Sequence, residues 1–172
     1  MQKLLLVLTM FSGLVCSAQP SLSLRAYKQA VAPGTVPVGI NENSSPGAEV
    51  RKRIATRYYF YLSYSPKTTI QPQRVWIGKK AYTIEVEPVP KTPVEHINRN
   101  IPTHPVTTVL VPRTSQKVVR LKPGAATSAT PLPASARTLI ETSELVVSYT
   151  WKGKTYYKAL NKITVLDPEM ME

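Results

Sequence analysis

Alternation of apolar and polar side chains with a period of two is the feature that most constrains the fold of this chain. It is clearest over residues 57–64, a run that Ser65-Pro66 ends because proline cannot donate to a β-ladder. One face of this segment carries Tyr58, Phe60, Leu62 and Tyr64, and the other carries Arg57, Tyr59, Tyr61 and Ser63. Successive side chains of a strand point to opposite faces, so residues 57–64 are predicted to form a strand with the first face in the core.

The same pattern predicts about nine strands in the whole chain. The others lie at residues 22–27, 74–77, 81–87, 106–111, 116–121, 145–151, 155–160 and 162–166. The sequence shows no helical stripe with a cap at its start, and residues 135–142 are the best place for a short helical turn. Two similar strings are Trp76-Ile77-Gly78-Lys79 and Trp151-Lys152-Gly153-Lys154. Both predict tight turns between strands, because glycine readily adopts the positive φ that such turns need.

Three irregular segments, at residues 32–48, 88–105 and 123–136, hold most of the 16 prolines. Residues 124–129 lack the side-chain bulk for burial and predict a mobile loop. Many short strands with such connections are typical of a sandwich or a barrel, and the long connections favour a sandwich. The chain is therefore predicted to be all-β, with an immunoglobulin-like Greek-key β-sandwich of about seven to nine strands and long Pro-rich loops.

Residues 1–18 are predicted to be a cleavable secretory signal peptide. Lys3 supplies the positive start, residues 4–15 are apolar, and small side chains precede a cut before Gln19. An apolar run of about 12 residues is shorter than the roughly 20 that a membrane-spanning helix needs, so no transmembrane segment is expected after cleavage. Residues 19–172 are then predicted to form a single β-sandwich domain.

Cys16 ends the apolar run, where a bacterial lipoprotein would carry its acylated cysteine. Leu14 and Val15 are bulkier than the small residues that precede such a cysteine, which disfavours a lipid anchor. Cleavage would also remove the only cysteine, so the mature domain must be held together by packing and hydrogen bonds without a disulfide. Export without cysteine is more typical of a bacterial envelope than of a eukaryotic secretory pathway, and we expect the periplasm or the medium.

The mature chain is strongly basic. Its net charge falls only from +12 to +11 on cleavage, because the leader contains one lysine and no acidic residue. A charge of this size favours polyanionic partners such as acidic polysaccharide, lipopolysaccharide or nucleic acid, with nucleic acid the least expected of the three.

The densest basic run precedes an aromatic strand face. The candidate polyanion-binding residues are Arg51, Lys52, Arg53, Arg57, Tyr59 and Tyr61. Cations beside exposed aromatic rings are suited to stacking and pairing with a sugar or a base. The alternative is that a second sheet or a loop covers both tyrosines and that the basic run is a solubilising edge.

Groups that support catalysis are few in this sequence. Glu95, His96 and His104 are conceivable metal ligands, but their spacing matches no familiar ligand pattern, and we expect ordinary surface-loop histidines. Glu85 and Glu87 share one face of a predicted strand, where outward glutamates are usually just the solvated side. The mature chain has no thiol and no Gly-x-Ser-x-Gly elbow, so we expect no enzyme and no cofactor.

Three hypotheses follow from the sequence. The first is an exported, non-catalytic β-sandwich protein of the bacterial envelope that binds or scaffolds an unknown partner, such as another envelope protein. The second is a binder of anionic polymers that acts through the basic-aromatic patch. The third is a cryptic metal-dependent enzyme that uses Glu95, His96 and His104.

Overall fold

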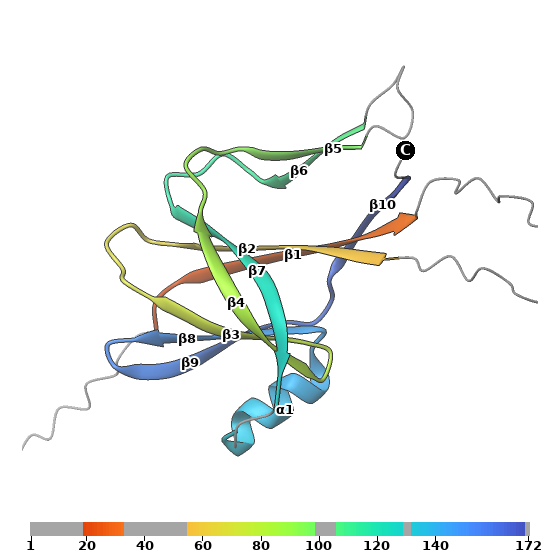
Figure 1. Cartoon of the computed structure of the whole chain (residues 1–172). Helices are drawn as coiled ribbons and strands as arrows, with labels where there is room; N and C mark the ends of the chain where they lie inside the picture. Colours follow the sequence, from red (N-terminus) through yellow and green to blue (C-terminus); the bar gives the residue numbers. More distant parts are fainter. Residues whose placement is uncertain (1–18, 33–54, 99–105, 129–131, 171–172) are drawn as a thin grey trace, which may run out of the picture.

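The computed structural model describes residues 19–32, 55–98, 106–128 and 132–170, and this part of the chain is nearly all β (Figure 1). Its strands are β1 (Leu22–Ala32), β2 (Ala55–Tyr64), β3 (Gln71–Ile77), β4 (Lys80–Pro88), β5 (Val94–Asn98), β6 (Val106–Val111), β7 (Lys117–Thr127), β8 (Leu145–Trp151), β9 (Lys154–Leu160) and β10 (Thr164–Met170). One helix, α1 (Ala134–Thr142), precedes β8.

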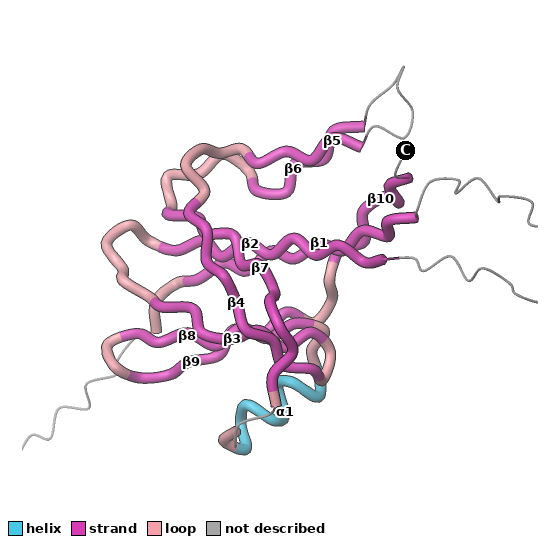
Figure 2. The backbone as a smooth tube through the Cα atoms, in the orientation of Figure 1, coloured by secondary structure: helices cyan, strands magenta, loops and turns pink. Residues whose placement is uncertain are grey.

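The strands form one large mixed sheet and one small sheet. The large sheet has eight strands in the order β10-β1-β2-β7-β4-β3-β8-β9, and β5 and β6 form a separate hairpin. Among the described strands, β1 and β10 are the only parallel pair. Figure 2 shows the large sheet curling on itself, with β5 and β6 over β1 and β2 and with α1 at the opposite end. The predicted all-β, sandwich-like fold is confirmed.

The inner face of the curled sheet holds the main hydrophobic core. Phe60 and Leu62 of β2 have no exposed surface, and Val75 of β3 and Val147 of β8 meet them from the far side of the curl. These residues alternate along their strands with residues on the outer face, because a strand turns successive side chains to opposite sides. The inward face predicted for residues 57–64 is the one that the structure places in this core.

Two smaller clusters cover the outer face of the large sheet. Tyr27, Tyr59 and Tyr61 pack under the β5–β6 hairpin, against Leu110 and Val111. A second cluster lies under α1 and consists of Trp76, Ala81, Ile140 and Val146. The helix has no side-chain hydrogen bond at its N-cap, so packing of its buried face holds it in place.

Two tight turns close the β3–β4 and β8–β9 hairpins. Gly78 adopts a φ of 58° between β3 and β4, and Lys152 and Gly153 adopt φ of 47° and 74° between β8 and β9. In the β8–β9 turn both central residues have positive φ, which is the type I′ geometry and matches the twist of the flanking strands. Both turns were predicted from their glycines.

The structure differs from the sequence-based expectations in the proline-rich segments. Residues 94–98 form β5, although residues 88–105 were predicted to be irregular. Likewise, β7 continues through Pro123 and Gly124 to Thr127, where the sequence predicted a mobile loop. In both places a paired neighbouring strand supplies the order that the local sequence does not show. The described strands number ten, and the predicted helical turn near residues 135–142 is α1.

Glu144 joins the start of β8 to the chain that leads into β10. Its carboxylate accepts a hydrogen bond from the Ile163 amide at 2.9 Å and lies 3.5 Å from Lys28 Nζ. The backbone hydrogen bond from Ile163 lowers the pKa of Glu144, and Lys28 and Lys162 lower it further, against a smaller opposing effect of burial. The charged form is therefore favoured by folding.

We expect Glu144→Gln to reduce stability at neutral pH and to lose this effect in acid. Because the folded-state pKa is lowered, the contribution of Glu144 is present above the unfolded value of about 4.5 and is lost as pH falls through the folded value. Urea midpoints at pH 7 and pH 3 measure this change. Glu141→Gln, at an exposed position of α1, is the control and should leave both midpoints unchanged. An equal loss at the two pH values would contradict the expectation.

Candidate functional site

The structure places the predicted aromatic residues of β2 beneath the β5–β6 hairpin. Tyr59 and Tyr61 are only 8% and 4% exposed, so neither ring presents a surface on which a ligand could stack. Arg57 is exposed and forms an ion pair with Glu169 of β10 at 2.9 Å. Arg51, Lys52 and Arg53 lie outside the described residues. The covered-tyrosine alternative is therefore the one observed, and the role of the basic run stays a prediction.

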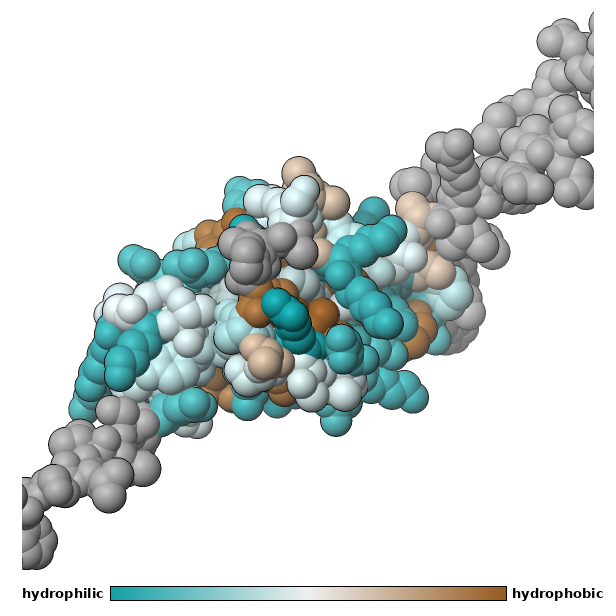
Figure 3. All heavy atoms as spheres, turned by 90° about the horizontal axis from the view of Figure 1, so that it is seen from below, coloured by the Kyte–Doolittle hydropathy of each residue, from teal (hydrophilic) through white to brown (hydrophobic). Residues whose placement is uncertain are grey.

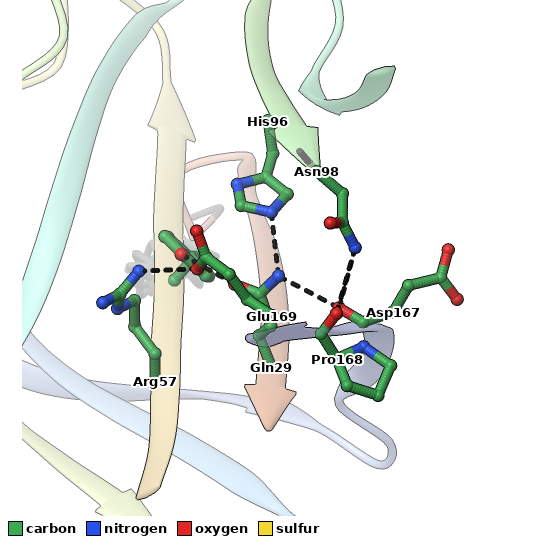
Figure 4. Close-up of polar contacts among 8 residues, drawn as sticks. Gln29, Arg57, His96, Asn98, Asp167, Pro168 and Glu169 are labelled. Carbon is green, nitrogen blue, oxygen red and sulfur yellow. Dashed lines mark hydrogen bonds and ion pairs between the residues drawn. The ribbon is translucent and has the colours of Figure 1, made fainter. Parts of the chain in front are cut away.

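A buried polar network lies under the same hairpin (Figure 4). Gln29 of β1 has no exposed surface, and its amide nitrogen donates to the Asp167 carbonyl at 3.0 Å. The same nitrogen lies 3.0 Å from His96 Nε2, and the Tyr59 hydroxyl donates to Gln29 Oε1 at 3.1 Å. With the amide oxygen accepting from Tyr59, the amide nitrogen of Gln29 carries two hydrogens for its two contacts, the Asp167 carbonyl and His96 Nε2.

Neighbouring side chains complete this layer. The His96 ring packs against Tyr59 with centroids 5.4 Å apart, and the Arg120 guanidinium lies 5.6 Å from the Tyr59 centroid. Burial raises the pKa of Tyr61, and the charge of Arg120 partly opposes that rise. Asn98 Nδ2 also donates to the Pro168 carbonyl at 3.2 Å. The network thus links β5 to β1, β2 and β10, and we call it a structural tether.

The residues proposed as metal ligands do not converge in the part of the chain that the structure describes. His96 faces the large sheet, whereas Glu95 is exposed on the opposite side of β5. His104 lies outside the described residues, so that part of the hypothesis stays untested. Within the described ranges, no three residues of the types His, Cys, Asp and Glu group closely enough to hold a metal ion.

The two glutamates of β4 occupy the solvated positions that the sequence predicted. Glu85 is exposed, and Glu87 is ion-paired with Lys122 of β7. Both glutamates face lysine or arginine on that strand, in register with Lys122 and Arg120.

An open groove lies at the end of the large sheet, between the loop that joins β2 to β3 and the turn that joins β8 to β9. We call it the Trp151 groove. Its volume is about 700 Å³, and it is lined by Lys67, Thr68, Thr69, Gln71, Thr150, Trp151, Lys152 and Gly153. The loop side is held by a hydrogen bond from the Thr68 amide to the Ser65 carbonyl, and the other side is held by the type I′ turn.

Trp151 is partly exposed and rests on an aromatic ladder that reaches the core. Its ring lies 5.9 Å from that of Tyr156, which stacks on the buried Tyr149 at 5.8 Å. Lys152 Nζ lies 4.7 Å from the Trp151 centroid, so a cation already occupies one side of the indole. Rings supported in this way lose little freedom when a ligand stacks on them.

The two chain segments that line the groove carry charges of one sign. Residues 65–74 and 145–160 contain no acidic residue, and their basic residues are Lys67, Arg74, Lys152, Lys154 and Lys158. An indole ring, ammonium groups and threonine hydroxyls together can stack on a planar or ring-shaped group, pair with an anion and donate hydrogen bonds. These groups are suited to binding a ligand. The groove brings them together from positions about 80 residues apart in the sequence.

The string Trp151-Lys152-Gly153-Lys154 predicts only a turn. The available signal was a tryptophan beside a lysine at the tip of a hairpin, an exposed place for a large aromatic ring. The loop residues that face it, Lys67 and Thr68, carry no local sign of this role.

Comparison with protein-family models, with curated proteins and with solved structures gives no match for this chain. In the described ranges, no helix has the length and apolar character needed to cross a membrane.

Proposed function

We propose that the chain is an exported, non-catalytic β-sandwich protein of the bacterial envelope that binds an anionic polymer. The observation that carries this proposal is the Trp151 groove, where Lys67 and Lys152 flank a supported indole ring in a region without acidic residues. Export rests on the leader predicted at residues 1–18, with the periplasm or the medium as destination.

The charge of the whole chain supports the same ligand class. A net charge of about +11 after cleavage attracts polyanions from a distance and speeds their association. Local contacts in the groove then supply affinity, because lysines displace the counterions of the polymer and the indole gives a stacking surface. The buried network at Gln29 lies apart from the groove, and its side chains contact one another and the Asp167 carbonyl.

Salt dependence tests the proposal. Affinity of the mature protein for heparin and for lipopolysaccharide should fall steeply between low and moderate ionic strength. The double variant Lys67→Ala/Lys152→Ala should weaken binding about tenfold or more and reduce the salt slope by about one per lysine removed, as lysine–phosphate contacts do. Isothermal titration at several salt concentrations measures both effects.

Lys79→Ala/Lys80→Ala is the matched control, because it removes two exposed lysines from the turn between β3 and β4. Binding that is insensitive to salt, or that the control weakens equally, would contradict a site at the groove. Charge reversal at Arg51, Lys52 and Arg53 tests the run predicted from sequence. A loss confined to that variant would move the site there.

A further inference from the structure

A hollow lies on the outer face of β3, β8 and β9, the face on which α1 also packs. We call it the Ser148 hollow. Its volume is about 240 Å³, and its aromatic side chains, Trp76 and Tyr157, belong to the cluster under α1. Trp151 packs instead against the inner core. The hollow is therefore a site separate from the Trp151 groove.

A small residue on the central strand creates this hollow. Ser148 of β8 has Arg74 of β3 and Tyr157 of β9 as its two cross-strand partners. Neighbouring strands lie about 4.8 Å apart, so the two larger side chains start about 10 Å from each other, on either side of the serine. Ser148 is only 4% exposed and forms the floor. A ligand above it can contact both larger side chains.

One wall of the hollow is aromatic. Tyr157 is partly exposed, and its ring lies 6.2 Å from that of Trp76, which is largely buried. Tyr157 therefore offers the accessible ring, and Trp76 supports it. Such a ring gives an apolar surface on which the C–H face of a sugar can pack, and its hydroxyl adds a polar contact.

The other groups around the hollow are one cation and several neutral polar side chains. The guanidinium of Arg74 has five donors in a planar fork, a shape that pairs with a carboxylate through two parallel hydrogen bonds. Gln73, Ser148 and Thr155 supply amide and hydroxyl groups that match sugar hydroxyls. Gln73 Nε2 also donates to Thr150 Oγ1 at 2.8 Å, which holds this amide at the rim.

We propose that the Ser148 hollow binds a single sugar ring that carries one carboxylate, as in a uronic acid. Its volume is below the roughly 300–1,000 Å³ of sites for drug-sized ligands, so it suits about one ring. On the side of α1, shown in Figure 3, hydrophobic residues form only small patches between hydrophilic ones, which favours a polar ligand over an apolar protein surface. This inference goes beyond the proposed function, because it adds a second site that needs no polymer.

Titration with two simple sugars tests the site. Glucuronate should bind the wild-type protein with a dissociation constant of about 1 mM, as expected for a ligand of one small ring. Glucose should bind about tenfold more weakly or less, because it has no carboxylate to pair with Arg74. NMR titration measures both constants, and the amide signals of Arg74, Ser148 and Tyr157 should shift.

Variants assign the two halves of the ligand. Arg74→Gln should remove the preference for glucuronate over glucose and leave glucose binding unchanged. Tyr157→Ala should weaken both sugars about tenfold, whereas Tyr157→Phe keeps the ring and should retain most of the affinity. Arg113→Gln is the matched control, because Arg113 is exposed between β6 and β7, and it should change neither constant.

Each other outcome would overturn the inference. No binding of glucuronate, equal binding of the two sugars, or an equal loss in Arg113→Gln would exclude an acidic-sugar site at the hollow. Benzoate binding as tightly as glucuronate would overturn the sugar class.

The groove variant separates this inference from the proposed function. Lys67→Ala/Lys152→Ala should weaken the anionic polymer and leave glucuronate unaffected. Loss of glucuronate binding in that variant would move the ligand to the Trp151 groove and overturn the site at Ser148. Failure of the wild-type protein to bind heparin or lipopolysaccharide would contradict the proposed function alone.

Discussion

Replacement of Phe60 by alanine should lower the free energy of unfolding by about 3–5 kcal/mol. Phe60 has no exposed surface and lies on β2, between Ala26 of β1 and Leu121 of β7. Deleting its ring removes buried apolar surface and leaves a cavity in the curled sheet, since close-packed neighbours relax only in part. Residues 19–172 contain no cysteine, so no disulfide links the strands around this position.

Urea unfolding of the wild-type and Phe60→Ala proteins measures this effect. The midpoint should fall while the slope with denaturant stays constant, because the surface exposed on unfolding hardly changes. Val165→Ala is the control, since Val165 is 65% exposed on β10 and should change stability by about 0.5 kcal/mol or less. If Phe60→Ala lowers the free energy of unfolding no more than the control does, burial of Phe60 in this core is contradicted.

Gln29→Leu should have the next largest effect on stability, a loss of about 2–4 kcal/mol. Leucine keeps most of the volume of glutamine but leaves the Tyr59 hydroxyl, His96 Nε2 and the Asp167 carbonyl without this partner. Each unpaired polar group in a buried place costs about 1–3 kcal/mol, and these costs do not add fully. Gln73→Leu is the matched control, because Gln73 is exposed and makes its hydrogen bond at the surface.

Two measurements distinguish the network from general packing. In the double variant Gln29→Leu/Tyr59→Phe the loss should be smaller than the sum of the single losses, since the second change removes the hydroxyl that the first leaves unpaired. Hydrogen exchange in Gln29→Leu should also accelerate more in β5, β6 and β10 than in β3 and β8. Simple additivity, or uniform acceleration, would argue against a tether.

The period-two pattern predicted most strands because one buried face is enough to produce it. It could not show that β2 is buried on both faces, since a tyrosine suits both a covered and a solvated position. β5 is the cover over Tyr59 and Tyr61, and its five residues follow three prolines within residues 88–93. Because β5 is short and lies close to prolines, the sequence did not predict it, and β5 is the strand that covers Tyr59 and Tyr61.

Gln29 was missed for a related reason. The predicted first strand stopped at Tyr27 because Lys28 and Gln29 are polar, and a buried glutamine has no signature apart from its partners. Its partners Asp167 and His96 come from β10 and β5, far along the chain. The Trp151 groove was missed because it depends on the order of strands in the sheet, which no local pattern records.

The parallel pairing of β1 with β10 affects when the large sheet can finish folding. Among the described strands, β1 has β10 as its outer neighbour, so a fragment that stops before residue 164 lacks that partner for residues 27–32. Contacts between positions so distant in sequence slow folding and delay its completion until the whole chain is present. For a protein that we propose is exported, pairing of β1 would thus wait until β10 has crossed the membrane, and the chain would remain incompletely folded during export.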